Sequence, residues 1–497
     1  MLQRSLTLTA IVVTVLSTGL PAQDASSVVA AAVKAMGVDT LNSITYSGTA
    51  RTGAFGHSKS IGEPMGPVNL TLITQYTRTI NFDKPVEAAL LVSRATGPTQ
   101  PPAVPGAPPP TAGVFNQNIT ATQSASLWGQ AQNIWTTPWG FLKLAAASAT
   151  TVRREGGQQV VSFSPEKLNL KSPTGQSYTV TGYISAQNLV TKVETRVEHA
   201  VAGDLLVEFE YSNYQNMNGV QVPTRIVQRQ AGLQTFDATI TSATPNPPNL
   251  AELLTPPAPG GGAPAAAPPP APAGPPQPER IGEGVFKIGG NYTSLAIDMA
   301  DHVLVIESGG GDARGLAVMA AAKQAVPNKP IRFVVNSHPH FDHAGGLGAA
   351  VAEGATILTH RNNEPVLERL LAGPRTLIGD SLSKVANRRT NVVEPVGDRD
   401  VRKGTNGKVV ELLRIPNEHS DGLLAVYLPA EKVVWTADIT VVNPTPAQLG
   451  VLRAAVDALT RLKIDYTTWI PAHPPNPDRP LTKADVDAAA SKGGSVH

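Results

Sequence analysis

Residues 256–279 divide this chain in two, because the stretch consists almost entirely of Pro, Ala and Gly. A segment of this composition cannot bury a hydrophobic core and is typical of a semi-extended spacer. A packed loop of this length would be unusual. With 497 residues the chain is also too long for one ordinary domain. We therefore predict a linker at 256–279 between two folded regions, residues 23–255 and 280–497.

The first 22 residues have the features of a secretion signal. Arg4 supplies a positive charge, the run Leu6–Leu16 is largely apolar, and small residues lead to Ala22, after which cleavage is expected. The alternative is a membrane anchor, but spanning a bilayer takes roughly 20 apolar residues. We expect a cleaved signal peptide at residues 1–22 and a periplasmic or secreted protein.

Composition narrows the classes of partner and site. Hydrophobic residues make up 41% of the chain and charged residues 16%, which is typical of a globular protein. The net charge is only +2, so the sequence does not favour nucleic acid as a partner. Cysteine is absent, which excludes disulfides and thiolate metal ligands.

Residues 23–255 are predicted to form an antiparallel, β-rich domain. Apolar and polar residues alternate most clearly over Leu205–Tyr211 and Tyr178–Tyr183, and Asn218-Gly219 marks a hairpin turn. A helix is expected at Ala25–Met36, and a helical insert broken at Pro138 within residues 127–147.

This arrangement of a helix, long strands and a Trp-bearing segment loosely resembles the curved-sheet domains of periplasmic lipoprotein carriers. The resemblance implies that residues 23–255 bind a lipid or another cell-envelope ligand, although their role is otherwise unassigned. His57 and His199 have no ligand-type neighbours in the sequence, and we interpret them as surface positions.

Residues 280–497 alternate strand-like and helix-like segments, which is typical of a layered α/β arrangement. One strand-like run, Ile331–Val335, leads into His338-Pro339-His340-Phe341-Asp342-His343. Imidazole and carboxylate are suitable ligands for zinc, iron or manganese. The alternative is an incidental surface cluster of histidines, but an apolar strand before the motif and glycines after it argue against that.

Three further ligand-type residues follow apolar segments, namely His419, Asp438 and His473. Two metals roughly 3.5–4 Å apart could bridge a water and clamp both the attacking and the leaving oxygens of a reaction. Ser420 and Asp421 are interpreted as groups that orient His419, His360 as a structural residue, and Tyr292 and Thr293 as a border of the pocket.

Residues 280–475 resemble the metallo-β-lactamase superfamily, whose hallmark is His-x-His-x-Asp-His followed by a His, an Asp and a final His. The resemblance implies a four-layer αβ/βα sandwich, so that the whole chain is of the α+β class. It also implies a first metal held by His338, His340 and His419, and a second held by Asp342, His343 and His473. Asp438 would bridge the two metals, and Asp342 would also act in catalysis.

The sequence departs from the family pattern at two points. Ala437 and Ala472 stand where the family often has Gly, and Pro474-Pro475 follows the final His473. Because Cys is absent, the β-lactamase subclass that uses a Cys ligand is excluded.

We expect an exported dinuclear hydrolase that uses a metal-bound hydroxide on an ester, thioester, lactone or lactam. The two divalent ions are expected to be zinc, with iron or manganese as alternatives. The substrate would be a small molecule. Two other functions remain open, a β-lactamase proper and a non-catalytic metal-binding or ligand-capturing envelope protein.

Overall fold

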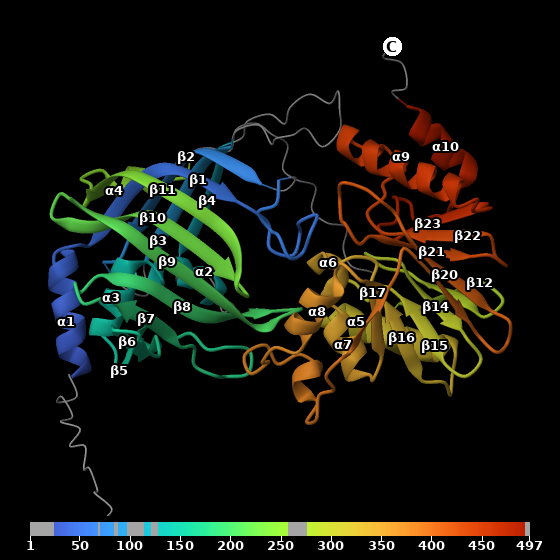
Figure 1. Cartoon of the computed structure of the whole chain (residues 1–497), viewed down its shortest axis with the longest axis horizontal. Coiled ribbons are helices and arrows are strands. Elements are labelled where there is room, and N and C mark those ends of the chain that lie inside the picture. Colours follow the sequence, from blue (N-terminus) through green and yellow to red (C-terminus); the bar gives the residue numbers. More distant parts are fainter. Residues whose placement is uncertain are drawn as a thin grey trace, which may run out of the picture.

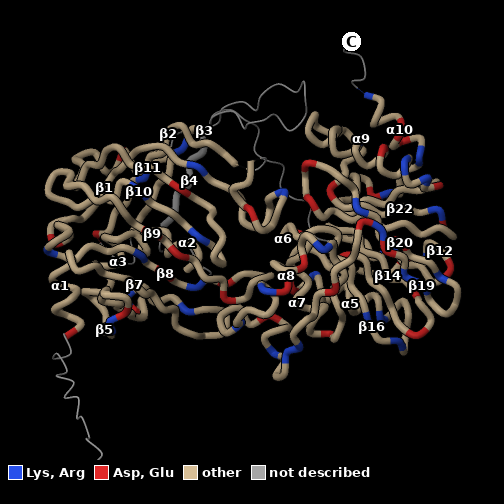
Figure 2. Tube along the Cα trace, in the orientation of Figure 1, with Lys and Arg blue, Asp and Glu red and all other residues tan. Residues whose placement is uncertain are grey.

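The structure is a computed structural model that describes residues 24–67, 70–83, 88–96, 114–120, 128–256 and 276–492. The predicted signal peptide and most of the predicted linker lie outside these residues. Among the helices of the described part, none is long and apolar enough to cross a membrane. Lys, Arg, Asp and Glu are interspersed along the trace in both halves of the molecule (Figure 2).

Residues 24–256, here called the N-terminal domain, are built on one antiparallel sheet of eleven strands in the order β4-β3-β2-β1-β11-β10-β9-β8-β7-β6-β5. The strands are β1 (Ser43–Thr52), β2 (Thr71–Asn81), β3 (Ala89–Thr96), β4 (Val114–Thr120), β5 (Thr150–Glu155), β6 (Gln158–Phe163), β7 (Val180–Ile184), β8 (Val190–His199), β9 (Gly203–Met217), β10 (Val220–Gln230) and β11 (Leu233–Pro245). Asn218 and Gly219 join β9 to β10 with positive φ values of 55° and 87°, as the predicted hairpin turn requires.

The curved sheet packs against helices, two of which carry all three tryptophans of the domain (Figure 1). These helices are α1 (Ala25–Met36), α2 (Trp128–Trp135) and α3 (Pro138–Ala146); two short helices, η2 (Glu166–Leu168) and α4 (Leu250–Leu253), lie elsewhere. Trp128, Trp135 and Trp139 are fully buried, so these large side chains fill the core. Pro138 is the first residue of α3, where its missing N–H costs nothing. The predicted broken helical insert is therefore two helices.

Residues 276–492, the C-terminal domain, contain two further sheets. The seven-stranded sheet runs in sequence order through β12 (Pro278–Gly282), β13 (Val285–Ile288), β14 (Ser294–Asp298), β15 (Val303–Ile306), β16 (Ile331–Val335), β17 (Thr356–His360) and β18 (Val393–Val396). The six-stranded sheet comprises β19 (Arg399–Lys403), β20 (Val409–Arg414), β21 (Leu424–Leu428), β22 (Val433–Thr436), β23 (Thr468–Pro471) and β24 (Leu481–Thr482).

Helices cover the outer face of each sheet of the C-terminal domain. On the first sheet these are α5 (Asp312–Ala325), α7 (Leu347–Ala352) and α8 (Glu364–Leu371), with η3 (Leu382–Lys384) beside α7, and on the second α9 (Pro446–Arg461) and α10 (Lys483–Ser491). Between the sheets lies a layer of buried apolar side chains that includes Leu304, Ile306, Leu412 and Val426. The result is a four-layer αβ/βα sandwich after an antiparallel β-rich domain, so the predicted fold class is confirmed.

In the C-terminal domain, the four strands that the apolar pattern of the sequence did not predict are all at sheet edges. β12 and β18 border the first sheet, and β19 and β24 border the second. Edge strands in natural proteins are short and carry charges or proline, which prevents further strands from pairing with them. β19, with the sequence Arg-Asp-Val-Arg-Lys, has no apolar alternation to reveal it.

The two domains are joined by a buried polar contact as well as by apolar packing. The Asp204 carboxylate, at the start of β9, accepts hydrogen bonds from the backbone N–H groups of Thr376 (2.8 Å) and Leu377 (2.9 Å). The buried Arg375 forms an ion pair with Asp380 and donates to the Val201 carbonyl. These contacts hold the loop after α8 against the β8–β9 turn of the N-terminal domain.

Candidate metal centre

The ligand-type residues stand where strands of both sheets end. His338 and His340 follow β16, and Asp342 and His343 lie on the short helix α6 (Phe341–Ala344). The other three candidates are single residues that each follow a strand: His419 follows β20, Asp438 follows β22 and His473 follows β23. The structure brings all seven predicted site residues together at one edge of the sandwich.

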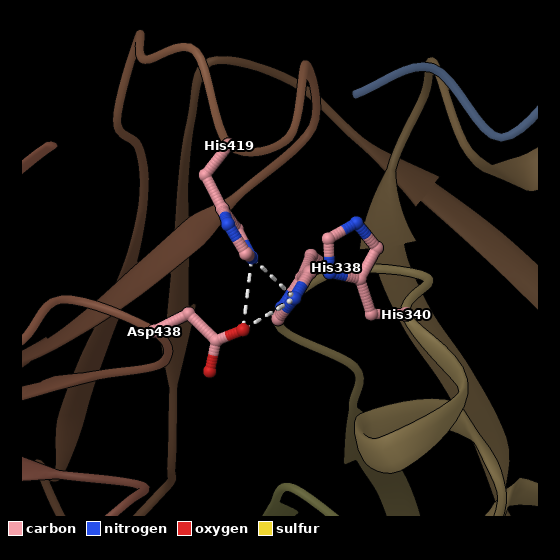
Figure 3. A group of neighbouring side chains, drawn as sticks. All are labelled: His338, His340, His419 and Asp438. Carbon is pink, nitrogen blue, oxygen red and sulfur yellow. Dashed lines mark hydrogen bonds and ion pairs between the residues drawn. The ribbon is translucent and has the colours of Figure 1, made fainter. Parts of the chain in front are cut away.

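The first group consists of His338, His340, His419 and Asp438, whose ligand atoms lie within 4.8 Å of one another. Figure 3 shows His338 and His419 converging on one oxygen of Asp438, with the ring of His340 beside them. Asp438 Oδ2 lies 2.8 Å from His419 Nε2 and 3.3 Å from His338 Nε2, and the two nitrogens are 3.2 Å apart.

The second group consists of Asp342, His343, Asp438 and His473. Asp438 Oδ1 lies 2.8 Å from His343 Nε2 and 2.7 Å from His473 Nε2. Asp342 Oδ2 is 3.4 Å from His343 Nε2 and 3.7 Å from His473 Nε2. The two prolines that follow His473 therefore do not prevent its side chain from joining the cluster.

Asp438 divides its carboxylate between the two groups, with Oδ2 facing one and Oδ1 facing the other. Its backbone has a φ of 50°, in the left-handed region that is uncommon for residues other than glycine, although aspartate adopts it more often than most. Strain of this kind persists where the surrounding structure enforces it, and it clusters at functional sites. The backbone conformation thus delivers the carboxylate to the point between the two groups.

The separations fit metal coordination. Tetrahedral zinc binds imidazole nitrogen at about 2.0–2.1 Å, which places neighbouring ligand atoms roughly 3.3 Å apart. The contacts of His338, His419 and Asp438 span 2.8–3.3 Å. One proton cannot satisfy two imidazole nitrogens and a carboxylate oxygen that all face one another, whereas one cation can.

Burial affects the protonation of the ligands. Burial and, second, the charge of the nearby His419 lower the pKa of His340 to about 3. Burial and, second, the charge of the neighbouring His343 hold the pKa of His338 well below its usual range. Both rings are therefore neutral, as a ligand must be. Burial alone would raise the pKa of Asp438, but hydrogen bonds from the surrounding histidines outweigh it and keep this group ionised.

Glu307 is a functional residue that sequence reasoning missed. It ends the apolar strand β15 and is completely buried, with a φ of 68°. Glu307 Oε2 lies 3.2 Å from His343 Nδ1 and accepts a hydrogen bond from Ser337 Oγ (2.5 Å). A carboxylate behind a ligand histidine fixes the ring and its tautomer. The only sequence signal was an acidic residue directly after four apolar ones.

The predicted neighbours of the site have different roles. Tyr292 does border the cluster, with its ring 4.9 Å from that of His473 and 5.6 Å from that of His343. Within the described part of the chain, neither the Ser420 nor the Asp421 side chain hydrogen-bonds to the His419 ring; Asn417 Oδ1 instead accepts from the His419 backbone N–H at 2.6 Å. The interpretation of those two residues as orienting groups is therefore not supported by the geometry.

Two histidines interpreted as surface positions lie close to the site. His57 is exposed, as predicted, but its Nδ1 is 3.7 Å from Asp342 Oδ1, and it forms a third ligand-type group with His340 and Asp342. His199 is half-buried, and its ring packs edge-on against Phe341 at 4.2 Å. Both belong to the N-terminal domain, so no local pattern could reveal these contacts.

A cleft of about 1020 Å³ opens beside the cluster. His419, Asp438 and His473 form one end of it, and residues of α9 form another wall. The basic side chains that line it are Lys59, Arg414 and Arg453, and the acidic ones besides Asp438 are Glu418, Asp421 and Asp457. A cleft of this size suits a small-molecule substrate rather than a polymer.

The fold and the cluster define a metal-binding hydrolase domain. Residues 288–473, which include all seven cluster residues, match the family model of the metallo-beta-lactamase superfamily. This part of the chain is a metallo-beta-lactamase domain, as the sequence motif predicted.

Individual relatives match the same half of the chain. The 2,4-dinitroanisole O-demethylase subunit alpha of Nocardioides sp. (strain JS1661) is 26% identical over 197 residues, which is 38% of this chain and 48% of that protein. The chain thus spans about half the length of this curated relative. Among solved structures, the metallo-beta-lactamase from Pontibacter korlensis is 15% identical, with 43% of this chain and 97% of that chain covered and a TM-score of 0.34. The metallo-beta-lactamase from Hirschia baltica is 20% identical, with 44% and 97% covered and a TM-score of 0.32.

Proposed function

We propose that this protein is an exported, dinuclear metal-dependent hydrolase of a small ester, thioester, lactone or lactam. The observation that carries the proposal is the division of the Asp438 carboxylate, whose two oxygens each face a separate pair of histidine nitrogens. A carboxylate in this position can bridge two cations. The C-terminal domain supplies all seven ligand-type residues, which fits the family match over residues 288–473.

Two divalent ions, zinc or alternatively iron or manganese, would lower the pKa of a water in this site and polarise a substrate carbonyl. The protein's own groups account for the rest. Asp342 directs Oδ2 toward His343 and His473, while its Oδ1 is buried and accepts no hydrogen bond among the described residues. In this proposal Asp342 orients the attacking water through the carboxylate oxygen that faces His343 and His473. Tyr292 closes the site on the side of His473.

The mixed charges of the cleft favour a substrate with both polar and apolar parts over a strongly anionic one. The apolar surface comes from residues such as Val451 and Pro416. When Asp438 is left out, the cleft is lined by as many basic as acidic side chains. This composition agrees with a carbonyl compound of modest size.

The test is metal analysis combined with a substrate panel on the purified full-length chain. We expect about two divalent ions per chain and turnover of at least one ester, thioester, lactone or lactam, lost with a chelator and restored by metal. Nitrocefin in the panel identifies a β-lactamase proper, and 2,4-dinitroanisole addresses the similarity to the demethylase subunit.

A matched pair of variants separates the site from the rest of the fold. Asp438→Asn should abolish turnover, whereas His302→Gln, at a histidine that contacts Asp301 and Phe333 instead of the cluster, should not. A folded chain that binds no metal would overturn the proposal and favour a ligand-capturing envelope protein.

A further inference from the structure

The loop between β1 and β2, described over residues 53–67, extends from the N-terminal domain to the metal-binding edge of the C-terminal domain (Figure 1). Three of its backbone carbonyls accept hydrogen bonds from that edge. The Gly56 carbonyl accepts from the Phe341 N–H at 3.1 Å, and the Lys59 carbonyl accepts from the Asp421 N–H at 2.8 Å. The Ser58 carbonyl lies 3.1 Å from His340 Nε2.

The contact with Ser58 determines the tautomer of His340. A carbonyl oxygen can only accept a hydrogen bond, so His340 Nε2 must carry a proton and donate it. In the neutral ring, the proton on Nε2 leaves the other nitrogen, Nδ1, with a free lone pair. Nδ1 is therefore the atom available to bind a metal, and the N-terminal domain fixes which atom this is.

The same loop also approaches Asp342, because His57, His340 and Asp342 form a group of ligand-type residues whose atoms lie within 4.8 Å of one another. Asp342 Oδ2 points toward His343 and His473, while Oδ1 is buried without a hydrogen-bond donor among the described residues. His57 Nδ1 lies 3.7 Å from that oxygen. A distance of 3.7 Å is too long for a hydrogen bond, so His57 contributes an electrostatic contact to an oxygen that accepts no hydrogen bond among the described residues.

Aromatic packing holds the loop in this position. The ring of Phe341 lies between two rings of the N-terminal domain, 5.1 Å from Phe55 and 4.2 Å from His199. Gly56 has a φ of 73°, and a Cβ atom there would lie 2.0 Å from the Phe341 ring. Only glycine allows the backbone to approach this closely, so the Gly56 position is specific for the docked loop.

We propose that the β1–β2 loop is a positioning element of the metal centre. The Ser58 carbonyl orients His340 with Nδ1 toward the metal, and His57 steadies the outer oxygen of Asp342. This proposal rests on the proposed dinuclear function, and it assigns the N-terminal domain a role in metal affinity. The ligands come from one domain, and the groups that hold two of them in place come from the other.

The test compares two glycine variants of the full chain. Gly56→Val should displace the loop and weaken binding of at least one Zn²⁺ ion by about 10–100-fold, measured by competition with a chromophoric chelator. Gly203→Val is the matched control, since Gly203 also has a positive φ of 69° and its added Cβ would lie 2.4 Å from the Pro374 carbonyl at the other domain contact. Its Zn²⁺ affinity should equal that of the unaltered chain.

A second readout and a second variant make the outcome decisive. Imidazole ¹⁵N spectra of the metal-free chain should show His340 protonated at Nε2, and Gly56→Val should abolish that single tautomer. His57→Ala should lower the affinity for one of the two Zn²⁺ ions only. If Gly56→Val does not fold, the result for His57→Ala tests the proposal in its place.

Three results would contradict the proposal in different ways. Unaltered Zn²⁺ affinity in folded Gly56→Val would overturn the positioning role alone. If Gly56→Val does not fold, unaltered Zn²⁺ affinity in His57→Ala would overturn it instead. An equal loss in Gly56→Val and Gly203→Val would assign the effect to general loosening of the domain contact, and would also overturn it. Absence of metal binding in the unaltered chain would overturn the proposed function as well.

Discussion

Glu307 Oε2 lies 3.2 Å from His343 Nδ1, and both side chains are completely inaccessible to solvent. Burial alone would lower the pKa of His343, but the charges of Glu307 and Asp438 outweigh it and raise this pKa to about 10. The carboxylate therefore makes this ring more basic and holds Nδ1 from the side opposite Asp438, and a metal bound at Nε2 would have to displace the second proton that the ring carries in the metal-free chain.

Replacement of this buried carboxylate should weaken the second metal site. In Glu307→Gln the charge is lost while the shape is kept, so we expect folded protein whose free energy of unfolding is lower by about 1.5–3 kcal/mol. Affinity for one of the two ions should fall by about 10–100-fold. Titration calorimetry with Zn²⁺ and urea unfolding measure the two effects. Unchanged affinity for both ions would show that Glu307 is only structural.

Removal of a ligand should separate activity from folding. His338→Ala and Asp342→Ala should each abolish hydrolysis and lower the metal content, because each removes a ligand from a different group. Both chains should retain the secondary structure of the unaltered protein, measured by circular dichroism. Full activity in both variants would refute the assignment of the site.

His199 should make the stability of the protein sensitive to acid. Burial, together with the positive charge of Arg375, lowers the pKa of His199 to about 4 from its usual 6.5. Between pH 6.5 and 4 the unfolded chain therefore binds a proton that the folded chain does not, and the free energy of unfolding falls as the pH falls.

The contribution of His199 can be isolated by a substitution that keeps its hydrogen bonds. His199 Nδ1 accepts from the backbone N–H groups of Val201 and Ala202, and an Asn side-chain oxygen can replace it. Melting temperatures at pH 7.5 and 5 should differ less in His199→Asn than in the unaltered chain. An equal acid sensitivity would exclude His199 as a source.

Export remains a prediction from the leader sequence. Expression of the whole chain in a bacterium with a periplasm should yield a mature protein that begins at Gln23, detected by intact mass. Removal of residues 1–22 should leave the protein in the cytoplasm. Retention of the leader on a periplasmic protein would instead indicate an anchor.

The ligand set could be predicted because each ligand follows an apolar strand or lies within one compact motif. His338, His340, Asp342 and His343 are close in sequence, and His419, Asp438 and His473 each end a recognisable hydrophobic run. Ligands at strand ends meet at one edge of a sheet, and the resemblance of the motif order to the metallo-β-lactamase superfamily implied the assignment of these residues to one metal centre.

The supporting groups could not be predicted in the same way. Ser58 lies 282 residues before His340 and acts through a backbone carbonyl, which every residue has. That carbonyl reaches the site through contacts between the two domains, including the packing of Phe341 against Phe55 and His199 and the backbone hydrogen bonds of Gly56 and Lys59. Glu307 acts alone at a strand end, where a single carboxylate is usually a turn residue. The lipid-binding role expected of the N-terminal domain stays a prediction.

One buried apolar cluster runs through both domains, from Trp139 and Val201 to Leu370 and Val334. Neither half can therefore be produced alone without exposing side chains that the other half covers. A truncation at the Pro-rich linker, which the sequence marks as the domain boundary, would therefore yield a fragment that aggregates. Protein engineers should therefore treat the whole chain as one folding unit. If the C-terminal domain is exchanged between relatives, the β1–β2 loop has to be exchanged with it.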